Sequence, residues 1–235
     1  SDLYVTAMNL NTAKHEIFGH DENNRVSVSK AVQASAALPG FYKPVKIGNE
    51  TFVDGAIIRT ANISIAVNHG ADLIICYNPF RPIVKPVDLP GRSSSDDIAH
   101  GGLFSIVNQV FRALLHSRLR LALHRFVENP SFTGDIILVE PAADDFKFYN
   151  MNPAAFWNRH EAAWMGFESL YESFSDHGNF NILQEILWEY DIEVSRKLID
   201  AELEQKQKIV KTVDDSKTIP FFSNVAPKVI RGGQR

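Results

Sequence analysis

Asp54 is the residue whose type and position could best do chemistry, because it stands at the end of an apolar strand. Phe52 and Val53 precede it, and the two smallest side chains, Gly55 and Ala56, follow it. A carboxylate against apolar surface is a stronger base than one in water, because its charged form is disfavoured there. It could then act as a general base. The alternative is an ordinary turn, since Asp-Gly is a common turn dipeptide.

Other reactive groups in the sequence form no recognised motif. The eight histidines are scattered, with no His-Glu-x-x-His, and no nucleotide-binding glycine loop occurs, so no metal or organic cofactor is expected. The Gly-x-Ser-x-Gly elbow of serine hydrolases is also absent. Ser105 and Ser169 come nearest, but each lacks the second glycine and lies in a helical pattern. Cys76 lies in an apolar run and is interpreted as an inert core thiol.

Composition limits the classes of protein to consider. The chain has 235 residues, 45% of them hydrophobic and 22% charged, which is ordinary for a globular protein that buries a core. A net charge of −4 and the lack of a nucleic-acid-binding motif argue against a nucleic-acid partner. The single cysteine excludes an internal disulfide and fits a reducing compartment, so a cytoplasmic location is predicted. Because residue 3 already begins a strand, we expect the chain to be the later part of a longer protein.

The elements around Asp54 must position it. Residues 3–19 alternate and predict a hairpin. Ser29 is expected to cap a helix over 30–37, which Pro39 and Gly40 end. Two strands follow, joined by a Gly-Asn turn, and the second stops at Asp54. A short helix closed by Gly70 is followed by an apolar strand without alternation, which predicts a strand covered on both faces. The two elements together suggest a parallel crossover. We therefore predict an α/β fold, with a mostly parallel central sheet flanked by helices.

The second part of the chain has two long helical regions. A Pro- and Gly-rich loop over 81–102 is predicted to lead into a helix over 103–127, followed by a strand over 135–141. The helix has apolar residues at three- and four-residue steps (Phe104, Val107, Phe111, Leu114, Leu115). Its arginines (Arg112, Arg118, Arg120, Arg125) are interpreted as a solvated face, with peripheral contact to lipid headgroups as the alternative.

Residues after 150 are predicted to form a helical extension and tail. An aromatic-rich stripe (Phe156, Trp157, Trp164, Phe167, Leu170, Tyr171, Phe174) is interpreted as packing against a second helix over 182–207. A role in holding a partner chain or covering an acyl site is the alternative. We therefore expect residues 1–150 to form the α/β part and residues 151–235 the extension.

An ordered set of features over about residues 1–80 resembles the later part of the catalytic domain in patatin-like phospholipases. It consists of a small-residue helix with its loop, the strand ending in Asp-Gly-Ala, and Gly-Ala-Asp before a buried strand. Its members are Ala34, Ser35, Ala37, Pro39, Phe41 and Pro44, then Asp54, Gly55 and Ala56, then Gly70, Ala71 and Asp72. The long helix also looks like a helix of that family.

This resemblance implies an acyl hydrolase that uses a serine–aspartate dyad without a histidine or cofactor. Asp54 would be the general base, Gly55 would let the backbone turn, and Ala56 would leave room for the serine. The substrate would be a lipid ester, such as an acylglycerol or phospholipid. The expected partner is the missing N-terminal portion that carries the nucleophilic serine, so the isolated chain is predicted to be inactive. A non-catalytic binding or structural module of the same fold is the alternative.

Overall fold

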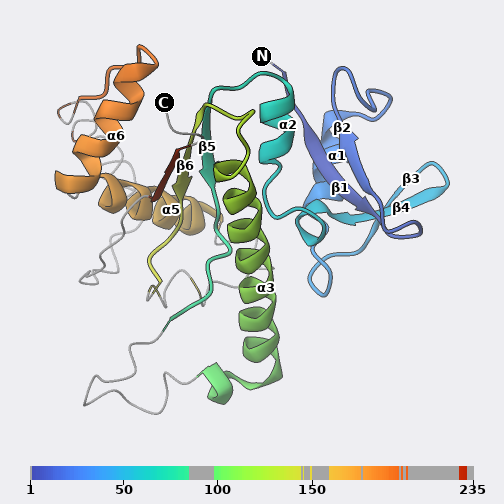
Figure 1. Cartoon of the computed structure of the whole chain (residues 1–235). Coiled ribbons are helices and arrows are strands. Elements are labelled where there is room, and N and C mark those ends of the chain that lie inside the picture. The colour runs from blue at the N-terminus through green and yellow to red at the C-terminus, as the bar shows by residue number, and fades with distance from the viewer. Residues whose placement is uncertain are drawn as a thin grey trace.

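The computed structural model describes residues 2–84, 98–143, 145, 149, 159–175, 177–195, 197, 200 and 228–231. These ranges form a mixed α/β fold with two separate sheets and flanking helices (Figure 1). The predicted α/β class is confirmed. The four-stranded sheet, however, is antiparallel throughout, and parallel pairing is confined to two strands of the three-stranded sheet.

The four-stranded sheet has the order β2-β1-β4-β3 and carries Asp54. Its strands are β1 (Val5–Asn9), β2 (His15–Phe18), β3 (Val45–Ile47) and β4 (Glu50–Asp54). The predicted hairpin over 3–19 is confirmed as β1 and β2, and the predicted strand pair ending at Asp54 is confirmed as β3 and β4. Gly48 has a φ of +60° in the turn between β3 and β4, a conformation that glycine adopts without steric cost.

Helix α1 (Val28–Ser35) packs on one face of this sheet through small side chains. Ala31 and Ala34 are buried against Ala7, Phe18 and Phe52, and the two phenylalanine rings meet edge to face at 5.6 Å. The N-cap is Ser27, so the predicted cap at Ser29 and helix over 30–37 were placed two residues too late. The helix begins earlier because Val28 and Ser29 already have helical geometry.

The three-stranded sheet has the order β5-β6-β7. Strands β5 (Leu73–Tyr77) and β6 (Asp135–Val139) are parallel, and β7 (Lys228–Arg231) pairs antiparallel with β6. The tail after residue 207, in which no element was predicted, thus supplies β7. The predicted crossover through α2 (Ile63–Asn68) does not join paired strands, because β4 already has β1 and β3 on its two sides. The parallel crossover runs from β5 to β6 instead.

That crossover contains η3 (Ile98–Gly101) and the long helix α3 (Gly102–Val127), which confirms the helix predicted over 103–127. Leu119 and Leu123 of α3 pack with Ile136 and Leu138 of β6 on one face of the sheet. On the other face, α6 (His177–Glu189) covers β6. Strand β6 is therefore buried along its whole length.

Strand β5 is covered on one face only. Its residues Ile74 and Cys76 lie in the core beneath α3, whereas Ile75 is 63% exposed. The prediction that both faces of this strand would be covered was therefore wrong. The reason is that the cluster formed by α6 covers β6 and reaches β5 only at Leu73.

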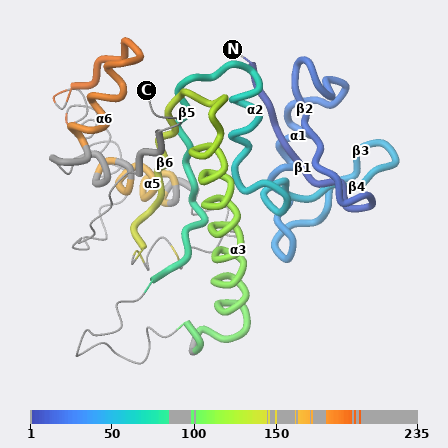
Figure 2. Tube along the Cα trace, in the orientation of Figure 1, coloured from blue at the N-terminus to red at the C-terminus, as the bar shows by residue number. Residues whose placement is uncertain are grey.

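The buried side of α3 differs from the predicted one. Of the predicted apolar stripe, Leu115 is buried, but Phe104, Val107 and Leu114 are exposed. Arg112, predicted to be solvated, is only 8% exposed. The first half of the helix extends past the carboxyl ends of β5 and β6, so only its second half has the sheet to pack against (Figures 1 and 2).

Helix α5 (Arg159–Ser175) precedes α6 and carries part of the predicted aromatic stripe. The rings of Trp164 and Phe167 lie 5.7 Å apart, and Met165 is buried. Phe156 and Trp157 lie outside the described residues, as do residues 201–207 of the second predicted helix. Helix α6 runs from His177 to Glu189 and matches the start of the second predicted helix, but residues 190–195 are not helical, so the continuous helix predicted over 182–207 was wrong there.

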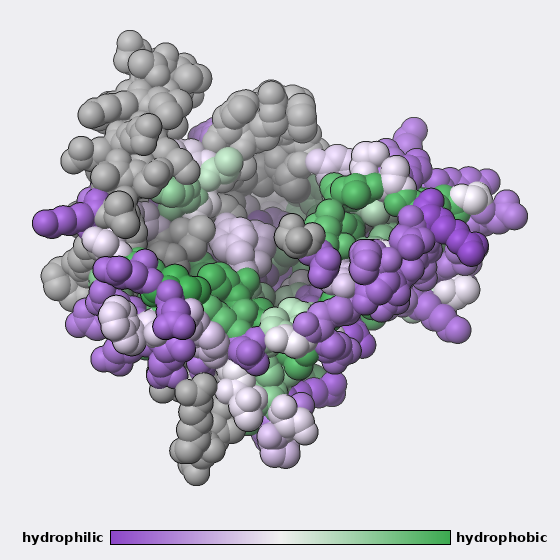
Figure 3. All heavy atoms as spheres, turned by 90° about the horizontal axis from the view of Figure 1, so that it is seen from above, coloured by the Kyte–Doolittle hydropathy of each residue, from purple (hydrophilic) through white to green (hydrophobic). Residues whose placement is uncertain are grey.

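Seen from above, hydrophobic side chains lie over the middle of the molecule and hydrophilic ones dominate the side of the four-stranded sheet (Figure 3). No helix in the described ranges is long and apolar enough to span a bilayer.

The packing of α3 can be tested with two leucines on opposite sides of the helix. Leu119 is 1% exposed and Leu121 is 54% exposed. We expect Leu119→Ala to lower the free energy of unfolding by about 2–5 kcal/mol, because it leaves a cavity against β6. Leu121→Ala should change it by less than about 0.5 kcal/mol. Urea unfolding followed by circular dichroism measures both, and equal losses would contradict this packing.

Candidate functional site

Asp54 is the last residue of β4, and its side chain is half-buried. Its strand neighbour is Ala7 of β1. The backbone N–H of Asp54 donates a hydrogen bond of 3.1 Å to the carbonyl of Ala37, just after α1. The strand end is therefore held by β1 and by the segment that follows α1, which gives the carboxylate a fixed position.

The carboxylate also caps the turn that follows it. Asp54 is the N-cap of a short 3₁₀ helix, η1 (Gly55–Ile57), and its Oδ1 accepts a hydrogen bond of 2.8 Å from the N–H of Ala56. The Asp-Gly turn, considered as the alternative for Asp54, is thus present in the structure. No described residue donates a hydrogen bond to Oδ2, so one carboxylate oxygen is committed to the turn and the other can accept a proton from elsewhere.

Burial raises the pKa of Asp54, and the hydrogen bond from the Ala56 N–H lowers it only in part, so the net shift is upward. An opposite charge would have reversed this direction, but burial and this one hydrogen bond are the causes that act on Asp54. A carboxylate with a raised pKa binds a proton more strongly, as a general base must.

Gly55 is required by a close approach of two backbone segments. A Cβ atom at Gly55 would lie 2.8 Å from the carbonyl oxygen of Thr6, well inside normal contact. The turn after Asp54 therefore passes directly against β1, and only glycine fits there. Ala56 supplies the N–H that binds Asp54. The roles predicted for these two residues beside a serine stay predictions.

The segment after Asp54 is fastened on two sides. Asn62, at the start of α2, donates a hydrogen bond of 2.6 Å to the Thr6 hydroxyl of β1. On the side of α3, the Arg118 guanidinium binds the carbonyls of Ile57 and Ile58. The Thr60 hydroxyl donates to the carbonyl of Leu115 in the same helix, at 3.0 Å. These bonds fix the turn that Asp54 caps relative to α3.

Neither serine considered as a candidate nucleophile in the sequence is hydrogen-bonded to Asp54. Ser105 lies within α3, and Ser169 is buried within α5. No described serine or threonine forms a hydrogen bond with the Asp54 carboxylate. Burial, together with the charge of Glu140, raises the pKa of the Cys76 thiol to about 11, so this thiol stays protonated at neutral pH. Among the described residues, Asp54 thus has no hydroxyl or thiol hydrogen-bonded to its carboxylate.

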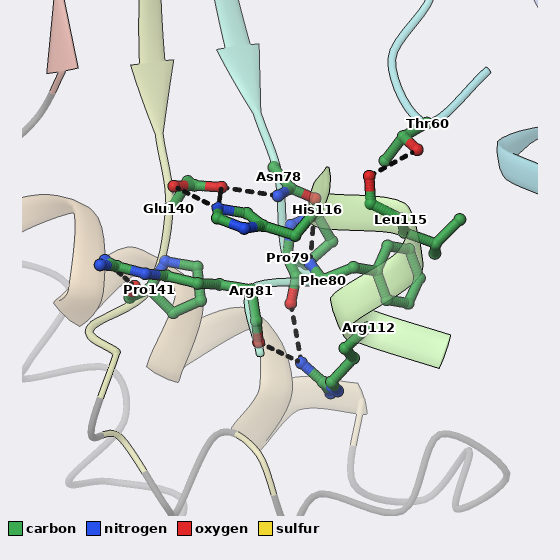
Figure 4. Close-up of polar contacts among 10 residues, drawn as sticks. All are labelled: Thr60, Asn78, Pro79, Phe80, Arg81, Arg112, Leu115, His116, Glu140 and Pro141. Carbon is green, nitrogen blue, oxygen red and sulfur yellow. Dashed lines mark hydrogen bonds and ion pairs between the residues drawn. The ribbon is translucent and has the colours of Figure 1, made fainter. Parts of the chain in front are cut away.

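A second polar cluster, which the sequence analysis missed, lies at the carboxyl ends of β5 and β6 (Figure 4). Asn78 and Glu140 each follow one of these parallel strands, and the Asn78 amide donates to Glu140 Oε1 at 2.7 Å. His116 of α3 approaches the same carboxylate, with its Nε2 3.2 Å from Oε1. The sequence did contain a sign of this cluster, since each of the two apolar strands is followed directly by a polar residue. The carboxyl ends of parallel strands meet at one edge of a sheet, so these two polar residues could have been expected to lie close together.

The environment of Glu140 shifts its pKa in the direction opposite to that of Asp54. Burial would raise the pKa of Glu140, but hydrogen bonds from His116 and Asn78 and the charge of Arg81 outweigh it, so the net shift is downward. Glu140 therefore stays ionised and orients His116. No described hydroxyl or thiol hydrogen-bonds His116, and no third His, Cys, Asp or Glu among the described residues joins the cluster as a metal ligand, so we assign it a structural role.

Arg112 holds the segment after β5 against α3. Its guanidinium donates to the carbonyls of Pro79 and Arg81, at 3.1 and 3.4 Å (Figure 4). It also lies over the rings of Phe80 and Tyr149. The arginine is buried because the first turns of α3 have backbone carbonyls, rather than a sheet, to pack against.

The first part of the chain matches a known family. Residues 1–67 match the family model described as Patatin-like phospholipase. The match includes Asp54, Gly55 and Ala56, and it confirms for this part of the chain the resemblance found in the sequence.

We expect Asp54→Asn to leave the protein as stable as the native chain at pH 7, or more so. A carboxyl group whose pKa is raised on folding contributes stability below its unfolded pKa, near about 3.9, and that stability is lost as pH rises through the folded pKa. Asparagine keeps the oxygen that accepts from Ala56 and has no charge to desolvate. Urea unfolding at pH 3 and pH 7 measures this. A variant that is less stable at pH 7 would instead favour the simple turn cap.

Glu140→Gln should behave in the opposite way. A carboxyl group whose pKa is lowered on folding contributes stability above its unfolded pKa, near about 4.3, and loses it as pH falls through the folded pKa. We expect the variant to lose about 1–3 kcal/mol at pH 7 and the difference to vanish at low pH. Glu128→Gln is the matched control, because Glu128 pairs with His124 in an exposed contact. A pH-independent loss would contradict the assignment.

Proposed function

We propose, with the patatin-like phospholipase match of residues 1–67 as the premise, that the chain supplies the general base of a serine–aspartate lipid acyl hydrolase. The observation that carries the proposal is the half-buried carboxylate of Asp54, at the end of β4 and inside the matched segment. Its raised pKa, with burial as the main cause, supports the same role.

The proposed reaction uses the two carboxylate oxygens differently. Oδ1 stays bound to the Ala56 N–H and fixes the plane of the carboxylate, while Oδ2 takes the proton of a serine hydroxyl. As that proton moves, the serine oxygen attacks the ester carbonyl carbon, and the proton then passes to the departing alcohol. Asp54 next takes a proton from water, whose oxygen attacks the carbonyl carbon of the acyl–serine ester. The bond between that carbon and the serine oxygen breaks, Asp54 returns the proton to the serine oxygen, and the fatty acid is released.

The serine of this reaction is proposed to come from polypeptide outside these residues. No Gly-x-Ser-x-Gly elbow occurs in the sequence, and no described hydroxyl is hydrogen-bonded to Asp54. The expected substrate is a lipid ester, and the chemistry above requires no metal or organic cofactor. A cytoplasmic protein at the membrane periphery fits a single thiol and a lipid substrate.

A second candidate function is a non-catalytic module of the same fold. The hydrogen bond from Ala56 to Asp54 favours it, because this bond alone would explain an aspartate before Gly55. The raised pKa of Asp54 disfavours it, because a residue kept only to cap a turn gains nothing from being half-buried.

The base role can be tested by hydrolysis of p-nitrophenyl butyrate. We expect the isolated chain to show no turnover above background, because it supplies no activated serine. In the product of the whole gene, Asp54→Asn should lower kcat about 10²–10⁴-fold, which is the usual contribution of a general base. The variant should not lose folding stability.

Asp72→Asn is the matched control, because Asp72 is an exposed aspartate just before β5. It should leave kcat unchanged. Turnover by the isolated chain that Asp54→Ala abolishes would refute the proposal of an outside serine. Unchanged kcat in Asp54→Asn of the whole gene product would refute the base role.

A further inference from the structure

In the first half of α3, the side that faces the protein is polar and the side that faces outward is apolar. Its inward side is polar: Gln109 hydrogen-bonds both the N–H and the carbonyl of Ile83, and Arg112 binds carbonyls of the same segment. Its outward side is apolar. The exposed residues, called here the apolar end of α3, are Leu103, Phe104, Ile106, Val107, Val110 and Leu114. An apolar group of this size facing outward marks an interaction surface.

The apolar end forms one stripe along the helix. Successive residues turn by about 100°, so Leu103, Ile106, Val107, Val110 and Leu114, at three- and four-residue steps, lie within about 100° of the helix circumference. Phe104 lies about 60° beyond the edge of this stripe and packs on Phe41. An apolar stripe of this width can enter a membrane interface or pack on a partner helix, so the charge beside it is what selects between them. The apolar end spans about 17 Å of helix, and the described part of α3 has no sheet beside it there.

The charge on α3 is the one that an anionic lipid surface attracts. The helix carries four arginines, two histidines and no acidic residue, in a chain whose net charge is −4. Arg120 and Arg125 are exposed on the half of α3 that follows the apolar end. An apolar segment followed by outward cations is the arrangement of helices that lie in a membrane interface, with arginines at the headgroups.

Further apolar groups extend this surface toward the candidate base. The ring of Phe41 contacts that of Phe104 edge to face at 5.3 Å, and the neighbouring Tyr42 is exposed. Both follow Ala37, whose carbonyl binds the N–H of Asp54. The surface and the candidate base are thus joined by one short segment.

From these observations we propose that the apolar end of α3, with Arg120 and Arg125, is a docking surface for an anionic lipid membrane. The apolar side chains enter the boundary between headgroups and acyl chains, and the arginines bind the headgroups. This surface goes beyond the proposed hydrolase function, and its lipid binding does not require Asp54.

Vesicle flotation of the whole 235-residue chain tests the proposal. We expect binding to phosphatidylcholine vesicles that contain phosphatidylserine, and weaker, salt-independent binding to phosphatidylcholine alone. Val110→Ser with Leu114→Ser should weaken binding to both about tenfold or more, because apolar burial is lost. Arg120→Gln and Arg125→Gln should each weaken binding to the anionic vesicles about fivefold.

The matched control is Val28→Ser with Val32→Ser, which alters two exposed valines on α1 and should leave binding unchanged. No vesicle binding, or equal loss in the control, would overturn the proposal. Self-association in sedimentation velocity that the α3 substitutions abolish would also overturn it and assign the surface to a second copy. Asp54→Asn should bind vesicles normally, so failure of the base role and failure of lipid docking give different results.

Discussion

The packing of the second half of α3 on the parallel pair β5 and β6 is the interaction on which the rest of the structure depends. Leu119 and Leu123 bury against β6 on one face of the sheet. Once that half is fixed, the first half must project past the strand ends, and the segment after Asp54 can be bound by Arg118. The same burial thus sets the outward apolar surface and anchors the turn that carries the candidate base.

Asp54 and Glu140 illustrate how the environment of a carboxyl group decides its use. Both are shielded from water, but Glu140 receives hydrogen bonds from His116 and Asn78, which hold it ionised. Asp54 receives one from the turn, and burial dominates. The first arrangement favours stability at neutral pH and the second opposes it. A carboxylate that opposes stability is more readily explained by function than by folding.

The two proposals concern parts of the molecule that the short segment from Ala37 to Phe41 joins. A base that acts on lipid esters must be brought close to lipid, and the apolar end of α3 touches Phe41, four residues beyond the segment that binds Asp54. A cationic, apolar helix in a chain of net negative charge could supply that proximity. Lipid docking would then position the protein, while the proton transfer would remain with Asp54.

The sequence by itself determined the local elements around Asp54, because alternation, turn glycines and Asp-Gly-Ala depend only on neighbouring residues. It predicted β3, β4, α2, β5 and the length of α3, and its resemblance matches the family found for residues 1–67. Only the tertiary structure decided which strands pair and which side of α3 is buried. Strand β4 was already paired on both sides, and Arg112 found backbone carbonyls to bind. Helical spacing identifies an apolar side but not the element that covers it, and the cluster of Asn78, His116 and Glu140 joins residues up to 62 positions apart.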